Sequence, residues 1–183
     1  MNEVEVELEL DPSLVRHVHD LTGMSDGDVE QALNAISGFT RSEYNSIRHL
    51  ESHGQTNSKI LLINQLIRRM PYFQGKIYRG LRFFKEEKFR EFIENLKRDR
   101  ILTLDAMSSF TSDLLVAESY SVSRYPVVLE VRDNNSGVAI EEFAAMYVEH
   151  EVLAPRGTRY EVTDISPAEE PGDITYIYLR EIR

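Results

Sequence analysis

The order of the hydrophobic patterns along the chain constrains its fold more than any other feature. Apolar residues recur at helical spacing through most of the first hundred residues, and short apolar runs bounded by turn residues follow. A period near 3.6 predicts amphipathic helices, whereas short runs between turns predict strands. Helices followed by mainly antiparallel strands are typical of an α+β fold, which we therefore predict. The predicted helices are 26–36, 41–51, 58–70 and 86–97, and the predicted strands are 76–81, 102–107, 127–131, 138–140, 160–165 and 174–182.

Local signals indicate where several of these elements begin and end. Ser25 and Thr40 each precede a helical pattern, and we expect each hydroxyl to accept a hydrogen bond from a free amide of the first turn. Pro71 follows the most apolar helical segment and is expected to end it. In residues 3–10, glutamates alternate with valines and leucines, which predicts a half-buried strand with an acidic outer face.

The chain is expected to form one domain. No repeat, low-complexity tract or Pro/Ser/Gly-rich linker divides its 183 residues, so a single domain is predicted over residues 1–183. The sequence contains no cysteine, which excludes disulfides, cysteine-ligated metals and thiol nucleophiles. The reducing cytosol is therefore the expected compartment.

The charge of the chain limits its partners. Lys and Arg together number 21 and Asp and Glu 31, for a formal net charge of −10. A negative balance of this size disfavours gripping nucleic acid by bulk electrostatics, so no direct nucleic-acid binding is predicted. The N-terminus is acidic where a signal peptide would be basic, and no apolar run approaches the roughly 20 residues of a membrane span. We expect a soluble, cytoplasmic protein with no membrane partner, and no feature bears on its oligomeric state.

Residues 147–162, YVEHEVLAPRGTRYEV, place two glutamates two residues apart at the start of a predicted strand. Alternate side chains of an extended segment point to the same face, so Glu149 and Glu151 are expected to present their carboxylates on one side of a sheet. The glutamates of residues 3–9 share this spacing, so the spacing alone is not specific. What distinguishes this stretch is the apolar pair after it, followed by a Pro/Gly turn and a second strand.

Residues 60–81, ILLINQLIRRMPYFQGKIYRGL, combine an apolar helix with a short strand. Asn64 and Arg68 are four residues apart and so share one face of the helix. The strand places Arg79 between Tyr78 and Gly80, where a guanidinium could offer two planar donors to a phosphate and the glycine could let a ligand approach the backbone. The alternative interpretation is structural: Arg68 as part of a basic last helical turn, and Arg79 as an ordinary paired strand residue.

A cluster of hydroxyls, SSFTS, occupies residues 108–112. Thr111 or Ser112 could cap a helix predicted over residues 113–120. Alternatively, a hydroxyl of this cluster could orient a catalytic carboxylate, and the two interpretations are compatible.

Two common kinds of site have little support. The glycine-rich phosphate loops GxGxxG and GxxxxGK are absent. His49 and His53 could share a helix face, but the glutamate of a zincin motif is displaced and no third ligand is evident. We therefore predict no metal, and any nucleotide must be held in another way.

The separate motifs together resemble a known signature. In order and spacing, Arg79 in YRGL, Ser109 in SSFTS and the Glu149–Glu151 pair are similar to the arginine, serine and glutamate motifs of mono-ADP-ribosyltransferases. The likeness is to clostridial C2/C3-type toxins and to phage enzymes that modify host proteins. The INQLIR helix resembles the Asn/Arg helix that contacts NAD in this family.

The resemblance extends from about Thr40 to Val162 and has one departure. The family usually shows Ser-Thr-Ser where this chain has Ser-Phe-Thr in residues 109–111. Ser108 or Ser112 therefore stays an alternative to Ser109.

The resemblance implies a fold of two packed, mainly antiparallel sheets around an NAD-binding cleft, with helices supplied by the N-terminal half. It implies NAD as co-substrate without a metal, and a phage or bacterial effector that transfers ADP-ribose to an arginine of a target protein, with host cytoplasm as a further compartment. NAD hydrolysis by water is the alternative, and a catalytically silent binding module is disfavoured because the polar residues that the chemistry needs are present.

The resemblance also implies a role for each site residue. Glu151 would stabilise the ribosyl cation, Glu149 would orient the acceptor arginine and take its proton, and Ser109 would hold Glu151. The residues implied to contact NAD are Asn64, Arg68, Tyr78, Arg79, Gly80 and Ser109, with Arg79 and Arg68 on the pyrophosphate.

Overall fold

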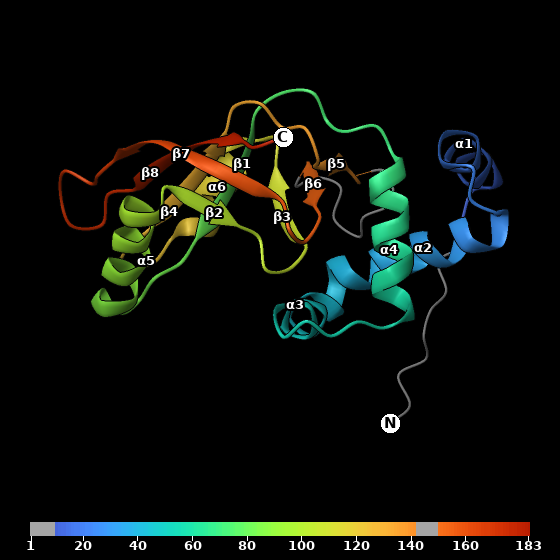
Figure 1. The fold of residues 1–183 in the computed structure, drawn as a ribbon, viewed down its shortest axis with the longest axis horizontal. Coiled ribbons are helices and arrows are strands. Elements are labelled where there is room, and N and C mark those ends of the chain that lie inside the picture. Colours follow the sequence, from blue (N-terminus) through green and yellow to red (C-terminus); the bar gives the residue numbers. More distant parts are fainter. Residues whose placement is uncertain (1–9, 142–149) are drawn as a thin grey trace.

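The computed structural model describes residues 10–141 and 150–183, and it confirms the α+β class. The strand predicted at residues 3–10 falls almost entirely outside these ranges. Helices α1–α4 lie together beside one end of the sheet, and α5 lies at the other end (Figure 1). The helices are α1 (Pro12–Thr22), α2 (Asp26–Gly38), the π-helical segment η1 (Phe39–Glu43), α3 (Tyr44–Ser52), α4 (Ser58–Arg69), α5 (Glu86–Asp99) and α6 (Leu114–Ser121).

Side-chain caps explain several of these helix ends. Ser25 caps α2 as predicted, accepting a hydrogen bond from the Asp28 amide at 3.2 Å. The cap predicted at Thr40 was wrong, because the chain continues from α2 into η1 without an extended residue between them. Asp113 caps α6, accepting from the Leu115 amide at 2.9 Å, so neither of the hydroxyl residues proposed for that cap occupies the position.

In the described ranges, eight strands form one hydrogen-bonded series in the order β2-β7-β8-β4-β1-β3-β6-β5. Neighbouring strands are antiparallel except β4 and β8, which are parallel. The series bends so that β3 and β7 face each other, and the rings of Phe110 and Tyr160 lie 6.0 Å apart between them. The two sheets expected from the resemblance are thus two halves of one bent sheet. The strands are β1 (Ile77–Leu81), β2 (Ile101–Thr103), β3 (Ser108–Thr111), β4 (Val127–Val131), β5 (Val138–Ala139), β6 (Glu151–Ala154), β7 (Arg159–Ser166) and β8 (Thr175–Glu181).

The strand predicted over residues 102–107 was wrong in its bounds. Two strands replace it, because the chain changes partner: β2 pairs with β7, whereas β3 pairs with β6. Between them, Leu104 exchanges backbone hydrogen bonds with residues 157 and 158. Residues 108–111 are therefore strand, and the serine-rich motif lies within β3 rather than after a strand.

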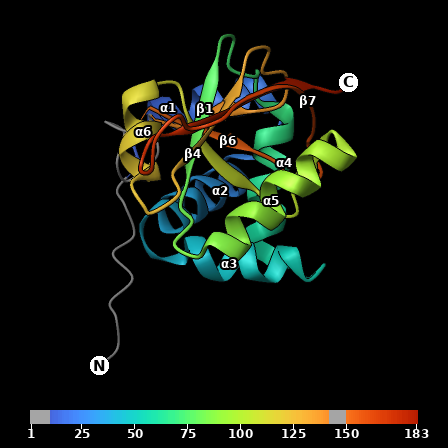
Figure 2. The same ribbon diagram turned by 90° about the vertical axis from the view of Figure 1, so that its left-hand side faces the viewer.

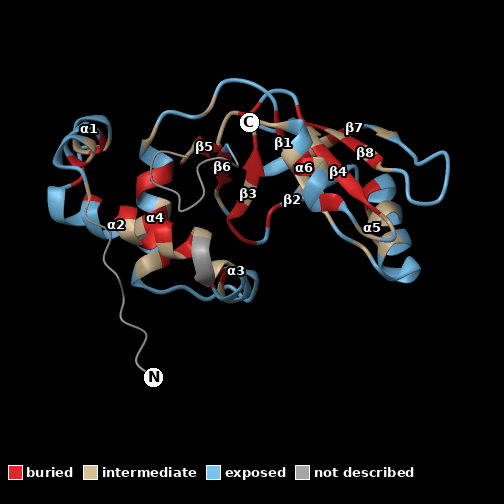
Figure 3. Ribbon diagram, turned by 180° about the vertical axis from the view of Figure 1, so that it is seen from behind, coloured by how far each residue is buried: buried red, intermediate tan, exposed pale blue. Residues whose placement is uncertain are grey.

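The buried apolar residues form two clusters, which hold the helices and the sheet together (Figure 3). One joins α1, α2 and α4 to residues of β5 and β6, and includes the buried Ile60, Ile63, Leu66 and Ile67 of α4. The other lies between the halves of the bent sheet and reaches α5. Helix α6 packs against β1, β3 and β4, whereas α5 contacts β2. Figure 2 shows α6 beside β1 and β4. Within the described ranges, no helix combines the length and apolar character needed to cross a bilayer.

The turn between β4 and β5 depends on one buried amide. Asn134 is 5% exposed, and its Nδ2 donates to Phe73 O at 2.6 Å and to Gly137 O at 2.9 Å. Its Oδ1 accepts from the Gly137 amide at 2.8 Å. One side chain thus ties the turn to the segment that leads into β1.

We predict that Asn134→Ala lowers the free energy of unfolding by about 2–3 kcal/mol, because buried backbone groups lose their partners. Thermal or urea unfolding would measure this loss. Asn135→Ala, at the half-buried neighbouring position, serves as the control and should stay within about 0.5 kcal/mol of the parent. Equal stability of the two variants would contradict the structural role of the Asn134 amide.

Candidate active site

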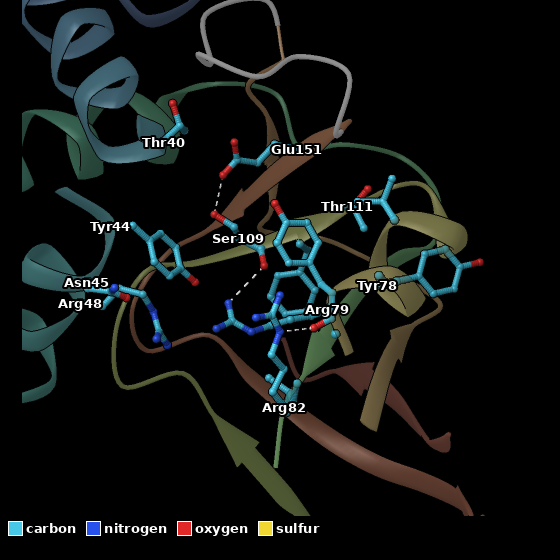
Figure 4. Close-up of a pocket in the computed structure, with 16 residues that line it drawn as sticks. Thr40, Tyr44, Asn45, Arg48, Tyr78, Arg79, Arg82, Ser109, Thr111 and Glu151 are labelled. Atoms are coloured by element: carbon cyan, nitrogen blue, oxygen red, sulfur yellow. Dashed lines mark hydrogen bonds between the residues drawn. The ribbon is translucent and has the colours of Figure 1, made fainter. Parts of the chain in front are cut away.

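A cavity of about 760 Å³ opens between the first helices and the middle of the sheet (Figure 4). Its walls come from η1 and α3 on one side, and from β1, β3, β6 and α6 on the other. The size falls within the usual range for small-molecule sites. The lining residues are Thr40, Tyr44, Asn45, Arg48, Tyr78, Arg79, Gly80, Leu81, Arg82, Ser109, Phe110, Thr111, Val116, Ala117, Tyr120 and Glu151.

A carboxylate and a hydroxyl from neighbouring strands meet in this cavity. Ser109 Oγ donates to Glu151 Oε1 at 2.5 Å (Figure 4). The register explains the contact: Glu151 stands opposite Thr111 in the β3–β6 pair, so Ser109 is its diagonal neighbour on the same face. Glu151 is 7% exposed. Its carboxylate is therefore held in one orientation at the cavity wall.

The structure also bears on the alternative serines. Ser108 is buried, and its hydroxyl donates to Ala106 O at 2.9 Å. The backbone amide of Ser112 donates to His150 O at 3.1 Å, which ties the end of β3 to the residue before β6. The hydroxyl of Ser109 contacts Glu151, so Ser109 stays the proposed serine of the motif.

The extended backbone that the sequence predicts before Glu151 is interrupted at His150. Strand β6 begins at Glu151, and His150 before it has a left-handed backbone with φ of 49°. The alternation of a strand therefore applies from Glu151 onward. Glu149 itself lies outside the described residues.

Arg79 approaches the same serine from β1. Its Nη1 donates to Ser109 O at 3.1 Å, and its guanidinium lies 6.0 Å from the centre of the Phe110 ring. Burial lowers the pKa of Arg79, the neighbouring Tyr44 opposes that shift, and the like charge of Arg48 adds to it. A guanidinium keeps its proton at any ordinary pH, so Arg79 contributes a fixed positive charge.

Arg48 reaches the cavity from α3, on the opposite wall. Its Nε donates to Met107 O at 3.2 Å, and its Nη2 donates to Ser108 Oγ at 3.4 Å. Its guanidinium also lies 5.4 Å from the centre of the Tyr44 ring. Helix α3 thus presents an oriented cation to the strand that carries the catalytic serine candidate.

The described lining residues carry more positive than negative charge. Three arginines, Arg48, Arg79 and Arg82, accompany a single carboxylate, that of Glu151. Arg82 is exposed at the rim, where its Nε donates to Tyr120 O at 2.6 Å. This local excess, in a chain with net charge −10, favours an anionic ligand. No group of three or more side chains suited to a metal occurs in the described parts of the chain.

Two of the predicted ligand contacts do not reach the cavity. Asn64 and Arg68 lie on α4 and are not among the lining residues. Asn64 Nδ2 donates to Ile60 O within its own helix at 3.0 Å, and Arg68 is exposed at the helix end. The buried face of α4 packs against the other N-terminal helices instead.

The helical side of the cavity is lined instead by residues that the sequence motifs did not identify. Thr40 on η1 and Tyr44, Asn45 and Arg48 on α3 line the cavity. Asn45 and Arg48 are three residues apart, so they share a helix face as closely as the pair on α4 does. The sequence signal was present on both helices, and only tertiary packing decides which helix faces the cleft.

Gly80 has a different role from the one expected. A Cβ on Gly80 would lie 2.1 Å from Ala117 O and 2.8 Å from Ser121 N, so the backbone of α6 fills the space beside it. The close approach that this glycine allows is that of α6, which forms one wall of the cavity. Tyr78, the preceding residue of β1, lines the cavity and is half-buried, and burial raises the pKa of its phenol.

Comparison with known families identifies the family to which the chain belongs. Residues 24–182 match the family model of the ADP-ribosyltransferase exoenzymes. The chain belongs to this family. As an ADP-ribosyltransferase, it carries the arginine of β1, the serine of β3 and the glutamate of β6 in one cavity. Among curated proteins, no sequence matches the chain.

Solved ADP-ribosyltransferases share the fold at low sequence identity. HopU1 of Pseudomonas syringae pv. tomato superposes with a TM-score of 0.71 at 15% identity, over 94% of this chain and 83% of that one. Vis of Vibrio splendidus, solved with an inhibitor, gives 0.67 at 18% identity, over 93% and 83%. An ADP-ribosyltransferase from Clostridium botulinum gives 0.66 at 16% identity, over 97% and 98%. The fold of these bacterial enzymes therefore spans nearly the whole chain.

We predict that Gly80→Ala displaces α6 and lowers the free energy of unfolding by about 1–3 kcal/mol, because backbone atoms cannot move aside as a flexible side chain would. Thermal unfolding would show the loss. Gly27→Ala is the matched control: its site in α2 is open, and alanine should stabilise the helix by about 0.5–1 kcal/mol. A Gly80→Ala protein as stable as the parent would show that α6 can yield at this contact.

Proposed function

We propose that this ADP-ribosyltransferase transfers ADP-ribose from NAD to arginine side chains of a target protein and releases nicotinamide. The observation that supports this most is the pairing of Glu151 with Ser109 in a cavity that also holds Arg79 and Arg48. A fixed carboxylate suits a positive centre, and two guanidiniums suit a pair of phosphates. NAD carries both kinds of group in one molecule.

The residues present fit NAD as the substrate. Arg79 and Arg48 approach the cavity from opposite walls, and the positive charge of Arg48 is near enough to lower the pKa of Arg79. Guanidiniums offer planar, paired donors to phosphate oxygens, so these two are proposed to hold the pyrophosphate. Arg48 thus takes the role expected of Arg68, and Asn45 takes the polar contact expected of Asn64. Thr40 and the aromatic side chains of the walls complete the enclosure.

Glu151 is proposed to act on the reacting centre. Breaking the bond between nicotinamide and C1′ of the ribose develops positive charge on the sugar, as in glycoside cleavage. A carboxylate that is already oriented stabilises that charge without reorganising, and one such group typically contributes about 10²- to 10³-fold to the rate. The hydrogen bond from Ser109 fixes the direction of the carboxylate.

The acceptor is proposed to be an arginine guanidinium. Because a guanidinium is protonated at ordinary pH, it needs a base to take its proton as its nitrogen bonds to C1′. Glu149, two residues before Glu151, is proposed as that base. The structural neighbour Vis has been solved in complex with agmatine, whose guanidinium is that of arginine, and this supports an acceptor of the same chemistry. The target is proposed to be a protein of the cytoplasm, in the producing cell or in a host.

Incubation with NAD and agmatine would test the proposal directly. We expect equal amounts of free nicotinamide and ADP-ribosyl-agmatine, measured by chromatography and mass spectrometry. Nicotinamide with free ADP-ribose as the main product would indicate a glycohydrolase with water as acceptor. Absence of nicotinamide release would contradict the use of NAD.

We predict that Glu151→Gln reduces nicotinamide release about 10²- to 10³-fold whatever the acceptor, because transfer and hydrolysis need the same positive centre stabilised. The substitution keeps the size of the side chain and an oxygen that can accept from Ser109, so the fold should be retained. Circular dichroism and thermal unfolding provide the control. Near-normal nicotinamide release by a folded variant would sink the assignment of Glu151.

We predict that Glu149→Gln separates the two reactions. Modification of agmatine should fall roughly 10²-fold, since its guanidinium loses the base, while hydrolysis should fall much less because water needs no guanidinium placed for attack. Both activities are measured on one protein preparation with the parent enzyme beside it. An equal loss of both would assign Glu149 to NAD itself and remove the support for an arginine acceptor.

A further inference from the structure

A buried carboxylate behind the cavity wall is not used by the chemistry above. Glu51 lies in the last turn of α3 and is 3% exposed. Its Oε1 accepts a hydrogen bond from the Met107 amide at 2.8 Å. Arg48, one turn earlier on α3, donates to the carbonyl oxygen of the same residue at 3.2 Å. Two side chains of one helix thus take both backbone groups of Met107.

Met107 needs such partners because of where it lies. It is completely buried and stands one residue before β3, whose pairing with β6 begins at Ser108. Buried backbone groups without partners cost free energy comparable to a lost hydrogen bond. Helix α3 therefore provides the hydrogen-bond partners of the Met107 backbone, as strand β6 does for the backbone of β3 from Ser108 onward. These bonds join α3 to the chain at Met107.

We propose that Glu51 is a positioning residue for NAD: through Met107 it sets how closely α3, with Arg48 and Tyr44, stands against β3. This inference rests on the proposed use of NAD. The anchor lies two residues before Ser109, whose hydroxyl holds Glu151 and whose carbonyl accepts from Arg79. The α3 wall and the sheet wall are thus brought together by contacts within three consecutive residues, from Met107, just before β3, to Ser109.

A change at Glu51 should affect the position of Arg48 on α3 more than the contact between Ser109 and Glu151. The contact between Ser109 and Glu151 is set by the β3–β6 register, so it survives the loss of the α3 anchor. The position of Arg48 depends on α3 itself. Loosening α3 should therefore weaken binding of the NAD pyrophosphate more than it slows the chemical step. Where chemistry is slow relative to substrate release, KM equals the dissociation constant, and calorimetric titration with NAD measures that constant directly.

The test measures NAD hydrolysis by the full chain at varied NAD concentration, with circular dichroism and thermal unfolding of each variant. For Glu51→Ala we expect KM for NAD to rise about tenfold with kcat within about threefold of the parent, an effect of the size that supporting residues have elsewhere. Glu51→Gln keeps an acceptor oxygen for the Met107 amide, so KM should return to within about threefold of the parent. Asn134→Ala, destabilised at a turn outside the cavity lining, should lower the melting temperature and leave KM unchanged.

Two results would overturn the inference: an unchanged KM in a folded Glu51→Ala protein, or an equal rise in KM for Glu51→Gln and Glu51→Ala. Should Glu51→Ala not fold, Glu51→Met fills the same space without an acceptor, and calorimetric titration with NAD gives its dissociation constant directly. An unchanged constant would again overturn the proposal. A parent enzyme that neither binds nor hydrolyses NAD would contradict the proposed function instead, so the two failures are distinguishable.

Discussion

The hydrogen bond from Ser109 to Glu151 depends on the register of two short strands, and the rest of the site is arranged around the strand that donates it. Strand β3 supplies the hydroxyl for Glu151 and the carbonyl oxygen for Arg79, and β3 with the residue just before it supplies the contacts for Arg48. If β3 slipped by one residue against β6, its side chains, including that of Ser109, would turn to the opposite face of the sheet. The register is protected because one face of β3 is buried against the second half of the sheet, where Phe110 meets Tyr160.

The electrostatics of the cavity run against those of the whole molecule. A formal charge of −10 describes the surface seen by a distant partner, whereas a small ligand inside the cavity meets three guanidiniums and one described carboxylate. At physiological ionic strength, exposed charges are largely screened beyond about 8 Å, so the local set dominates. Net charge can thus argue against a large nucleic-acid footprint without arguing against a nucleotide held by two arginines.

The sequence predicted the strand residues of the site better than its helical residues. Arg79, Ser109 and Glu151 stand on strands that pair with one another, and their local motifs are distinctive enough to place them. Helix α3 and helix α4 both carry an asparagine and an arginine at helical spacing, and periodicity cannot tell which helix faces the sheet. The choice made from the sequence, Asn64 and Arg68, lies outside the cavity lining. For Gly80 the residue was identified and its reason was not, because the clash with α6 arises only in three dimensions.

The strand order has a consequence for how the protein is made. Strand β8 comes after β1–β7 in the sequence, yet it lies between β7 and β4 in the sheet. During synthesis, the strands that carry Arg79, Ser109 and Glu151 leave the ribosome before β8, while β4 is still an edge with unpaired backbone groups. Open edges of this kind are templates for association with other chains, and long-range pairings form slowly. The nascent enzyme therefore holds Arg79, Ser109 and Glu151 before its sheet closes, and β4 stays an open edge until β8 pairs with it.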